Sequence, residues 1–374
     1  MYNAASHTKL DDKALVEKYK NLIQGDALRI WCSKDVKSLD FINSLNINKL
    51  EIYNSKKIVP KLKSNIIQKL EITNCDIQSV KDFQLENLEI LRISNFSEQY
   101  ESETLAQEIL RFQKLKELVL HGWIIDTTII SQMTDITNLG LSNCGLLSTE
   151  ALRPLINLEQ LYLQENKELD ITSLQYMIKL TKLNLSDCGL LSVDAIRSLF
   201  NLQELNLHQN KDINITSLQY LTKLTKLNLV SCNLVSLDAL RPLTLLKELV
   251  ISWNSIVYLQ AIIKLNQLSK LDARNNKIVD FQDFQHHPKV EMFDVKNQSK
   301  PTKEELQIAN ILREINSPIT CLKQININMK LSDIKHQNII IRTKKQLQVS
   351  LNSHAQFLAR IALLIQNNAF DGYQ

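Results

Sequence analysis

The chain has 374 residues, of which 44% are hydrophobic and 22% are charged, and its formal net charge is +4. This near-balance argues against a dedicated nucleic-acid-binding protein, which concentrates Lys and Arg on one surface. No run of about 18 apolar residues is present, so we expect no membrane-spanning helix and no membrane partner.

Residues 1–25 are predicted to form an N-terminal cap helix. In this segment Leu10, Leu15 and Leu22 share one helical face, and Gly25 provides a stop signal. The first twenty residues carry acidic side chains and lack the apolar core of a secretory signal. We therefore expect a cytoplasmic protein.

A repeated pattern extends over residues 26–298. Pairs of apolar residues in the form Leu-x-Leu, each typical of one short strand, recur at spacings of 20 to 22 residues, with a single step of 27. The thirteen predicted strands contain Leu28, Leu50, Leu70, Leu91, Leu118, Leu139, Leu161, Leu183, Leu205, Leu227, Leu249, Leu271 and Phe293. A period of this size indicates a solenoid, in which each repeat packs only on its neighbours.

A longer period is also present. Residues 171–200 and 215–244, which are 44 positions apart, agree at 20 of 30 positions. Return segments that begin with Ser148, Ser192 and Ser236 are predicted to form short capped helical turns. They alternate with repeats that lack this motif, which indicates duplication of a two-repeat unit. In the 27-residue step, the additional residues around Leu105 and Ile109 predict a longer helix.

Within a repeat the pattern is Leu-x-x-Leu-x-Leu-x-x-(Asn or Cys)-x-(Leu or Ile), as at Leu180, Leu183, Leu185, Cys188 and Leu190. This pattern resembles the leucine-rich repeat family, in its short 22-residue class. The resemblance implies an α/β solenoid with a concave parallel β-sheet and helical N- and C-terminal caps. It further implies a non-enzymatic scaffold or adaptor that binds a protein with its concave face.

Four cysteines, Cys75, Cys144, Cys188 and Cys232, occupy the inward Asn-equivalent position of a repeat. Since adjacent strands lie about 4.8 Å apart, cysteines two repeats apart exceed the roughly 7 Å limit on Cα separation for a disulfide. We expect buried, reduced thiols, which are typical of a reducing compartment. No CxxC or Cys/His cluster accompanies them, so no metal site is predicted.

Two ladders are predicted on the concave face. Lys182, Glu204, Lys226, Glu248 and Lys270 alternate in sign along one column and can hold strand register. Asn184, Asn206 and Asn228 form the next column, where we expect their amides to bond laterally to one another.

Outward residues that these ladders do not explain are the candidates for contact with a partner. They are Tyr162, His208, Val230, Val250, Trp253 and Arg274. An exposed Trp beside Val and Arg has the composition of an interface hot spot. Trp31 and Tyr53 are further candidates, whereas Trp123 either extends the surface or fills the irregular repeat.

Residues 299–319 are predicted to form a C-terminal cap helix, which Pro301 opens and in which Thr302 and Glu305 have the spacing of a capping box. Residues 320–374 are predicted to be a mostly helical tail. One alternative makes this tail a small effector module that the repeats target to a partner.

A second alternative is a regulatory subunit of a type-1-like protein phosphatase, because the 22-residue class includes one that holds its catalytic subunit on the concave face. The 27-residue step and the tail depart from that uniform array, so no binding residue is carried over. The sequence has no GxGxxG, GxxxxGK, HExxH or GxSxG motif. We therefore predict no catalytic residue and no cofactor, and we expect a monomer.

Overall fold

The structure, a computed structural model, describes residues 3–4, 23–32, 40–54, 61–75, 77, 79–96, 99–102, 104–280, 284, 287, 289–303, 306 and 309–310. The chain divides into two compact units, Met1–Gly189 and Leu190–Gln374. Residues 5–22 of the predicted N-terminal cap and the whole predicted tail, 320–374, lie outside the described residues.

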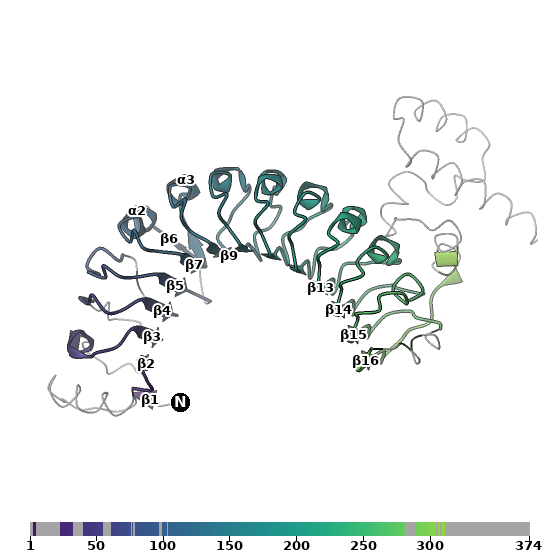
Figure 1. The fold of residues 1–374 in the computed structure, drawn as a ribbon, viewed down its shortest axis with the longest axis horizontal. Coiled ribbons are helices and arrows are strands. Elements are labelled where there is room, and N and C mark those ends of the chain that lie inside the picture. The colour runs from purple at the N-terminus through teal and green to yellow at the C-terminus, as the bar shows by residue number, and fades with distance from the viewer. Residues whose placement is uncertain are drawn as a thin grey trace, which may run out of the picture. The chain divides into compact units, whose positions relative to one another are not determined.

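The first unit contains a parallel sheet (Figure 1). In order across the sheet its strands are β1 (Asn3–Ala4), β2 (Ala27–Cys32), β3 (Lys49–Tyr53), β4 (Lys69–Thr73), β5 (Ile90–Ser94), β7 (Glu117–His121), β9 (Asn138–Ser142), β10 (Gln160–Tyr162) and β11 (Lys182–Asn184). Strand β1, which the sequence pattern did not predict, pairs with the end of β2 at Trp31 and Cys32.

The second unit continues the same type of repeat. Its parallel strands are β12 (Glu204–Asn206), β13 (Lys226–Asn228), β14 (Glu248–Val250), β15 (Lys270–Asp272) and β16 (Met292–Asp294). The thirteen predicted strands are thus confirmed as β2–β5, β7 and β9–β16. In each unit the strands lie on the inner side of the coil and the short helices on its outer side (Figure 1).

The leucines of the pattern form the core. In-register neighbours such as Leu227, Leu249 and Leu271 stack from strand to strand and are at most 2% exposed. Each buried Leu side chain contributes about 1.5–3 kcal/mol through the removal of its apolar surface from water. The flanking strand residues point the other way, so one surface of the sheet is packed and the other is available to solvent.

Short helical segments return the chain on the outer side. They are η1 (Asp40–Ser44), α2 (Leu105–Ile109), α3 (Thr127–Ile130), η2 (Glu150–Leu152), η3 (Thr172–Tyr176), η4 (Asp194–Ile196), η5 (Thr216–Tyr220) and η6 (Asp238–Leu240). The hydroxyls of the predicted serines, Ser148, Ser192 and Ser236, accept backbone N–H groups two residues on, at 3.1–3.2 Å, while the residue directly before each turn makes no side-chain cap. No described helix is long and apolar enough to cross a membrane.

The 27-residue step builds more than the predicted helix. Besides α2, it forms strand β6 (Tyr100–Glu101), which pairs with β8 (Trp123–Ile124) in a small second sheet. Trp123 takes the inward position that Asn or Cys has in other repeats and is only 1% exposed. Trp123 therefore fills the irregular repeat and does not extend the surface.

Asn254 shows how an inward amide connects neighbouring turns. Its Oδ1 accepts hydrogen bonds from the backbone N–H groups of Cys232 and Leu234, both at 3.0 Å. Its Nδ2 donates to the carbonyl oxygens of Leu229 and Ile251 at 2.8 and 2.9 Å. One side chain thus satisfies four backbone groups that burial removes from water. In the last repeat Gln298 takes this role, bonding to Ile278 N–H and Ala273 C=O at 3.0 Å each.

The cysteines in the same column, Cys75, Cys144, Cys188 and Cys232, are buried and form no disulfide, as predicted. Cys188 and Cys232 donate their thiols to the carbonyl oxygens of Leu163 and Leu207, both at 3.2 Å. In the preceding turns Glu168 and Asp212 have positive φ values of 58° and 63°.

These two left-handed residues are 44 positions apart and so follow the longer period of the sequence. The backbone N–H groups of Leu169 and Asp212 bond to the carbonyl oxygens of Cys188 and Cys232 at 3.3 and 3.1 Å. A thiol is a weak acceptor, and in these two repeats an N–H group of the preceding turn bonds to the backbone carbonyl of the Cys instead. Asn and Cys repeats therefore alternate together with two kinds of turn.

The thiols should be unreactive in the folded protein. Burial raises the pKa of Cys144 and Cys232 to about 12 and that of Cys188 to about 11. Since only the thiolate reacts, alkylation of these three cysteines at pH 8 should be at least about a hundredfold slower in the folded than in the unfolded protein. Peptide mapping after timed iodoacetamide labelling, with and without guanidinium, measures this ratio for each cysteine.

The same shifts set a pH dependence. A thiol whose pKa is higher in the folded state stabilises the fold fully below its unfolded pKa, near 9.0, and this contribution is lost as the pH rises toward 12. The urea midpoint should therefore fall between pH 9 and 11. Replacing Cys144, Cys188 and Cys232 by Ala should flatten this fall, and an unchanged slope would contradict the assignment.

Candidate protein-binding surface

The outward side chains of β12–β16, with the residues that follow each strand, form the surface called here the second-unit sheet face. Its first column is the predicted charge ladder. Lys226 lies 3.9 Å from Glu204 and 3.7 Å from Glu248, and Lys270 lies 3.5 Å from Glu248. These partly exposed pairs support strand register. The column ends at Met292, which pairs with Lys270 in register and is 61% exposed.

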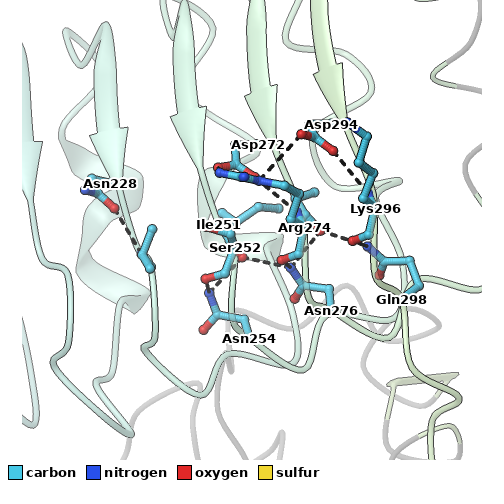
Figure 2. Close-up of polar contacts among 12 residues, drawn as sticks. Asn228, Ile251, Ser252, Asn254, Asp272, Arg274, Asn276, Asp294, Lys296 and Gln298 are labelled. Carbon is cyan, nitrogen blue, oxygen red and sulfur yellow. Dashed lines mark hydrogen bonds and ion pairs between the residues drawn. The ribbon is translucent and has the colours of Figure 1, made fainter.

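The second column contains Asn206, Asn228, Val250, Asp272 and Asp294. The expected lateral bonding between Asn206 and Asn228 was wrong. Each amide oxygen instead accepts the backbone N–H two residues on, at His208 and at Val230, at 3.1 Å. Figure 2 shows this bond for Asn228. This local turn is a common use of Asn and Asp side chains at the end of a strand.

Val250 interrupts this column, because its neighbours on both sides are polar. It pairs in register with Asn228 and Asp272 and is partly exposed. A Val side chain cannot accept a hydrogen bond from the backbone, so this residue provides apolar area on the sheet face instead.

Arg274 is held in one orientation by two carboxylates (Figure 2). Its Nε and Nη2 donate to the two oxygens of Asp272 at 2.9 and 2.7 Å, and Nε lies 3.6 Å from Asp294. Hydrogen bonds from Arg274 hold the pKa of Asp272 below its usual value. The Arg274 side chain remains 48% exposed. It therefore presents a fixed guanidinium, and binding a partner would cost little further side-chain entropy.

Trp253 is the most prominent residue of this surface, at 63% exposure. Its backbone N–H donates to the carbonyl oxygen of Arg274 at 3.0 Å, which places the two residues on adjacent turns. Its φ is +59°, in the left-handed region. In ten other repeats the equivalent position also has positive φ and is occupied by Asn54, Asn74, Gly122, Asn143, Glu165, Asp187, Gln209, Ser231, Asn275 and Asn297.

A bulky side chain in this conformation is strained by about 1–3 kcal/mol. Trp253 also buries little apolar area, so folding alone does not account for its presence. Strain of this kind is a pointer to function.

The remaining predicted residues fall in two places. His208 and Val230 are partly exposed and precede Trp253 on the second-unit sheet face, in the column of Arg274. Tyr162 lies on β10 of the first unit, partly exposed, and donates its hydroxyl to Gln160 at 2.8 Å. The structure therefore brings five of the six candidates onto one face.

Sequence reasoning missed Asp272 and Asp294, although the same-face spacing of Asp272 and Arg274 was a usable signal. The described residues contain no group of three or more His, Cys, Asp or Glu side chains that could hold a metal ion.

No family sequence model matches the chain, and no curated protein is similar enough in sequence to match. Solved structures do match. An internalin (inlF) from Listeria monocytogenes is 21% identical over 78% of this chain and 78% of its own, with a TM-score of 0.50. A leucine-rich repeat protein from Leptospira interrogans is 23% identical over 75% of this chain and 80% of its own, with a TM-score of 0.54.

These likenesses, together with the parallel strands and the Asn and Cys column, show that the chain has the leucine-rich repeat fold in an internalin-like form. The narrower resemblance to a phosphatase regulatory subunit stays a prediction.

Proposed function

We propose that this chain is a non-enzymatic scaffold that binds a protein partner on the second-unit sheet face, with Trp253 as the central anchor. Leucine-rich repeat proteins typically bind proteins, which supports the class of function. The observation that carries the proposal is the strained, exposed Trp253 at a position that small or polar residues occupy in other repeats.

The residues around Trp253 fit a hot spot. Val230 and Val250 add apolar area on the same face, and Arg274 adds a guanidinium held by Asp272. Trp and Arg are the residue types most enriched among hot spots. The surrounding Glu, Lys and Asp side chains largely neutralise one another and resemble the polar rim of an interface.

The surface is also pre-organised. Backbone hydrogen bonds and inward amides fix each strand, and the bidentate Asp272 pair fixes Arg274. Binding therefore orders few side chains, which preserves affinity. The four described cysteines are buried and form no disulfide, which supports the further proposal that the protein is located inside the cell.

The test uses a variant in which Val250 and Trp253 are replaced by the residue types found at the equivalent positions of neighbouring repeats. Val250→Asn with Trp253→Asn copies the residue types of the equivalent positions 228 and 275, so the fold should be retained. The matched control, Ser231→Asn with Asn275→Ser, changes the left-handed positions on either side of Trp253. Each protein is immobilised and exposed to lysate of the producing cells, and retained proteins are identified by mass spectrometry.

We expect a protein that wild type and control retain and that the Val250→Asn/Trp253→Asn variant loses. Equal retention of every protein by all three would overturn the assignment of the binding surface. Circular dichroism on each variant confirms folding beforehand.

A further inference from the structure

A second surface, separate from the one around Trp253, lies on the sheet of the first unit. The strands β2–β5 and β7, which Figure 1 labels, carry this surface, which is called here the Arg-aromatic face. Its residues are Arg29, Trp31, Tyr53 and Arg92, with Glu51, Glu71 and Glu117 beneath them. We propose that the Arg-aromatic face binds an acidic segment of a partner protein.

The charges of this face are layered. The Arg29 side chain is 70% exposed while that of its partner Glu51 is 10% exposed, and the corresponding values for Arg92 and Glu117 are 38% and 12%. Cations therefore form the outer layer and carboxylates the inner one. An approaching group meets guanidinium first, and this arrangement is complementary to negative charge.

The inner carboxylates orient the guanidinium groups. Glu51 accepts Nε of Arg29 at 2.6 Å and the Tyr53 hydroxyl at 3.0 Å. Glu117 accepts Nε and Nη2 of Arg92 at 2.6 and 2.5 Å. The described bond to Arg29 uses only Nε, so its two terminal nitrogens can form a two-pronged contact with an incoming carboxylate.

An aromatic pair borders these cations. The rings of Trp31 and Tyr53 stack with centroids 4.6 Å apart and planes 13° apart, on adjacent in-register strand positions. Both residues are partly exposed. A stacked pair next to a fixed guanidinium can hold the aliphatic or aromatic part of a peptide whose carboxylate reaches Arg29.

The charge count favours an acidic peptide over a nucleic acid. The three glutamates offset Arg29, Arg92 and Lys69, and Lys49 is offset by the equally exposed Asp26. Nucleic-acid binding depends on several uncompensated cations along the backbone. Moreover, Trp31 and Tyr53 already stack on each other, which leaves no gap between them for a base.

Fluorescence anisotropy with the full chain tests the proposal. The probe is a fluorescein-labelled peptide of Glu, Asp and Leu at low salt, and the comparison probes are its Gln/Asn counterpart and labelled oligo(dT). We expect the acidic peptide to bind wild type with an affinity that falls as salt is added, and the uncharged peptide to bind at least about tenfold more weakly.

Arg29→Gln with Arg92→Gln should lower the affinity for the acidic peptide at least about tenfold. The charge-matched control, Lys211→Gln with Lys264→Gln, removes two exposed cations from the second unit and should leave the affinity unchanged. Trp253→Asn should also leave it unchanged, which separates this surface from the one in the proposed function.

Arg29→Lys with Arg92→Lys keeps both positive charges above the glutamates. This variant replaces the Gln variant in the binding test if the Gln variant does not fold. It should bind the peptide more weakly than wild type, because Lys lacks the planar fork. The proposal is overturned if the acidic peptide does not bind wild type, if the Arg variants bind it as wild type does, or if oligo(dT) binds more tightly than the peptide and depends on the same arginines.

Discussion

Trp253→Asn is expected to raise the free energy of unfolding by about 0.5–1 kcal/mol and to weaken the partner complex at least about tenfold. The gain in stability follows from the backbone. Trp253 has a φ of +59°, and Asn tolerates this region far better than a bulky side chain does. Little packing is lost on substitution, because the side chain is 63% exposed.

The loss of binding follows from the opposite feature, since the exposed indole is the largest apolar group on the second-unit sheet face. Truncating a central Trp in an interface commonly costs about 2 kcal/mol or more, which corresponds to roughly thirtyfold in affinity. Urea unfolding followed by circular dichroism gives the stability, and titration calorimetry with the captured partner gives the affinity.

Trp253→Ala separates the two effects. It removes the indole but leaves a residue with a Cβ and no local polar group in the left-handed region, so it should lose binding without the full gain in stability. A Trp253→Asn protein less stable than wild type would show that the indole stabilises the fold. The strain argument for its functional role would then fail.

The repeat pattern alone predicted the strands because Leu-x-Leu fixes both the period and the buried side of each strand. For example, Leu249 and Leu271 are both buried when their strands pair in the register that places them side by side. The exposure of Trp253 followed from its place in the repeat, directly before the inward Asn254, and not from strand alternation, which would place it on the side of Leu249 and Ile251. Its left-handed backbone could have been read from the column that it shares with Asn143 and Asn275, since Asn favours that conformation.

Contacts between side chains were less accessible from the sequence. The amides of Asn206 and Asn228 could bond either to their own backbone or laterally to each other. The residue pattern is the same for both arrangements, so it does not distinguish them. The layering of Arg29 over Glu51 depends on how far each side chain extends from the sheet, which spacing does not encode. The 22-residue step from Leu28 to Leu50 already placed Trp31 beside Tyr53, but the stacking of their rings is not encoded in the spacing.

Asn254→Ala should lower the free energy of unfolding by about 3–5 kcal/mol. The substitution leaves the N–H groups of Cys232 and Leu234 and the carbonyl oxygens of Leu229 and Ile251 without their side-chain partner. An unsatisfied buried polar group costs about 1–3 kcal/mol, and partial relaxation of the turn reduces the sum. Urea unfolding monitored at the circular dichroism signal of the sheet measures the change.

Asn254→Cys distinguishes the acceptor role of the amide from its donor role. Cys occupies the equivalent position at Cys232, where its thiol donates to Leu207 C=O, but a thiol is a weak acceptor. In the turn before position 254 the left-handed residue is Asn233, one position earlier than the equivalent of Asp212, and the N–H groups of Cys232 and Leu234 bond to Oδ1 of Asn254.

Asn254→Cys should therefore be nearly as destabilising as Asn254→Ala. By contrast, Cys232→Ala, which loses only a weak donor and a small volume, should cost about 1–2 kcal/mol. Wild-type stability of the Asn254→Cys protein would mean that the turn can satisfy its own N–H groups. The alternation of Asn and Cys repeats would then need a cause other than the two kinds of turn.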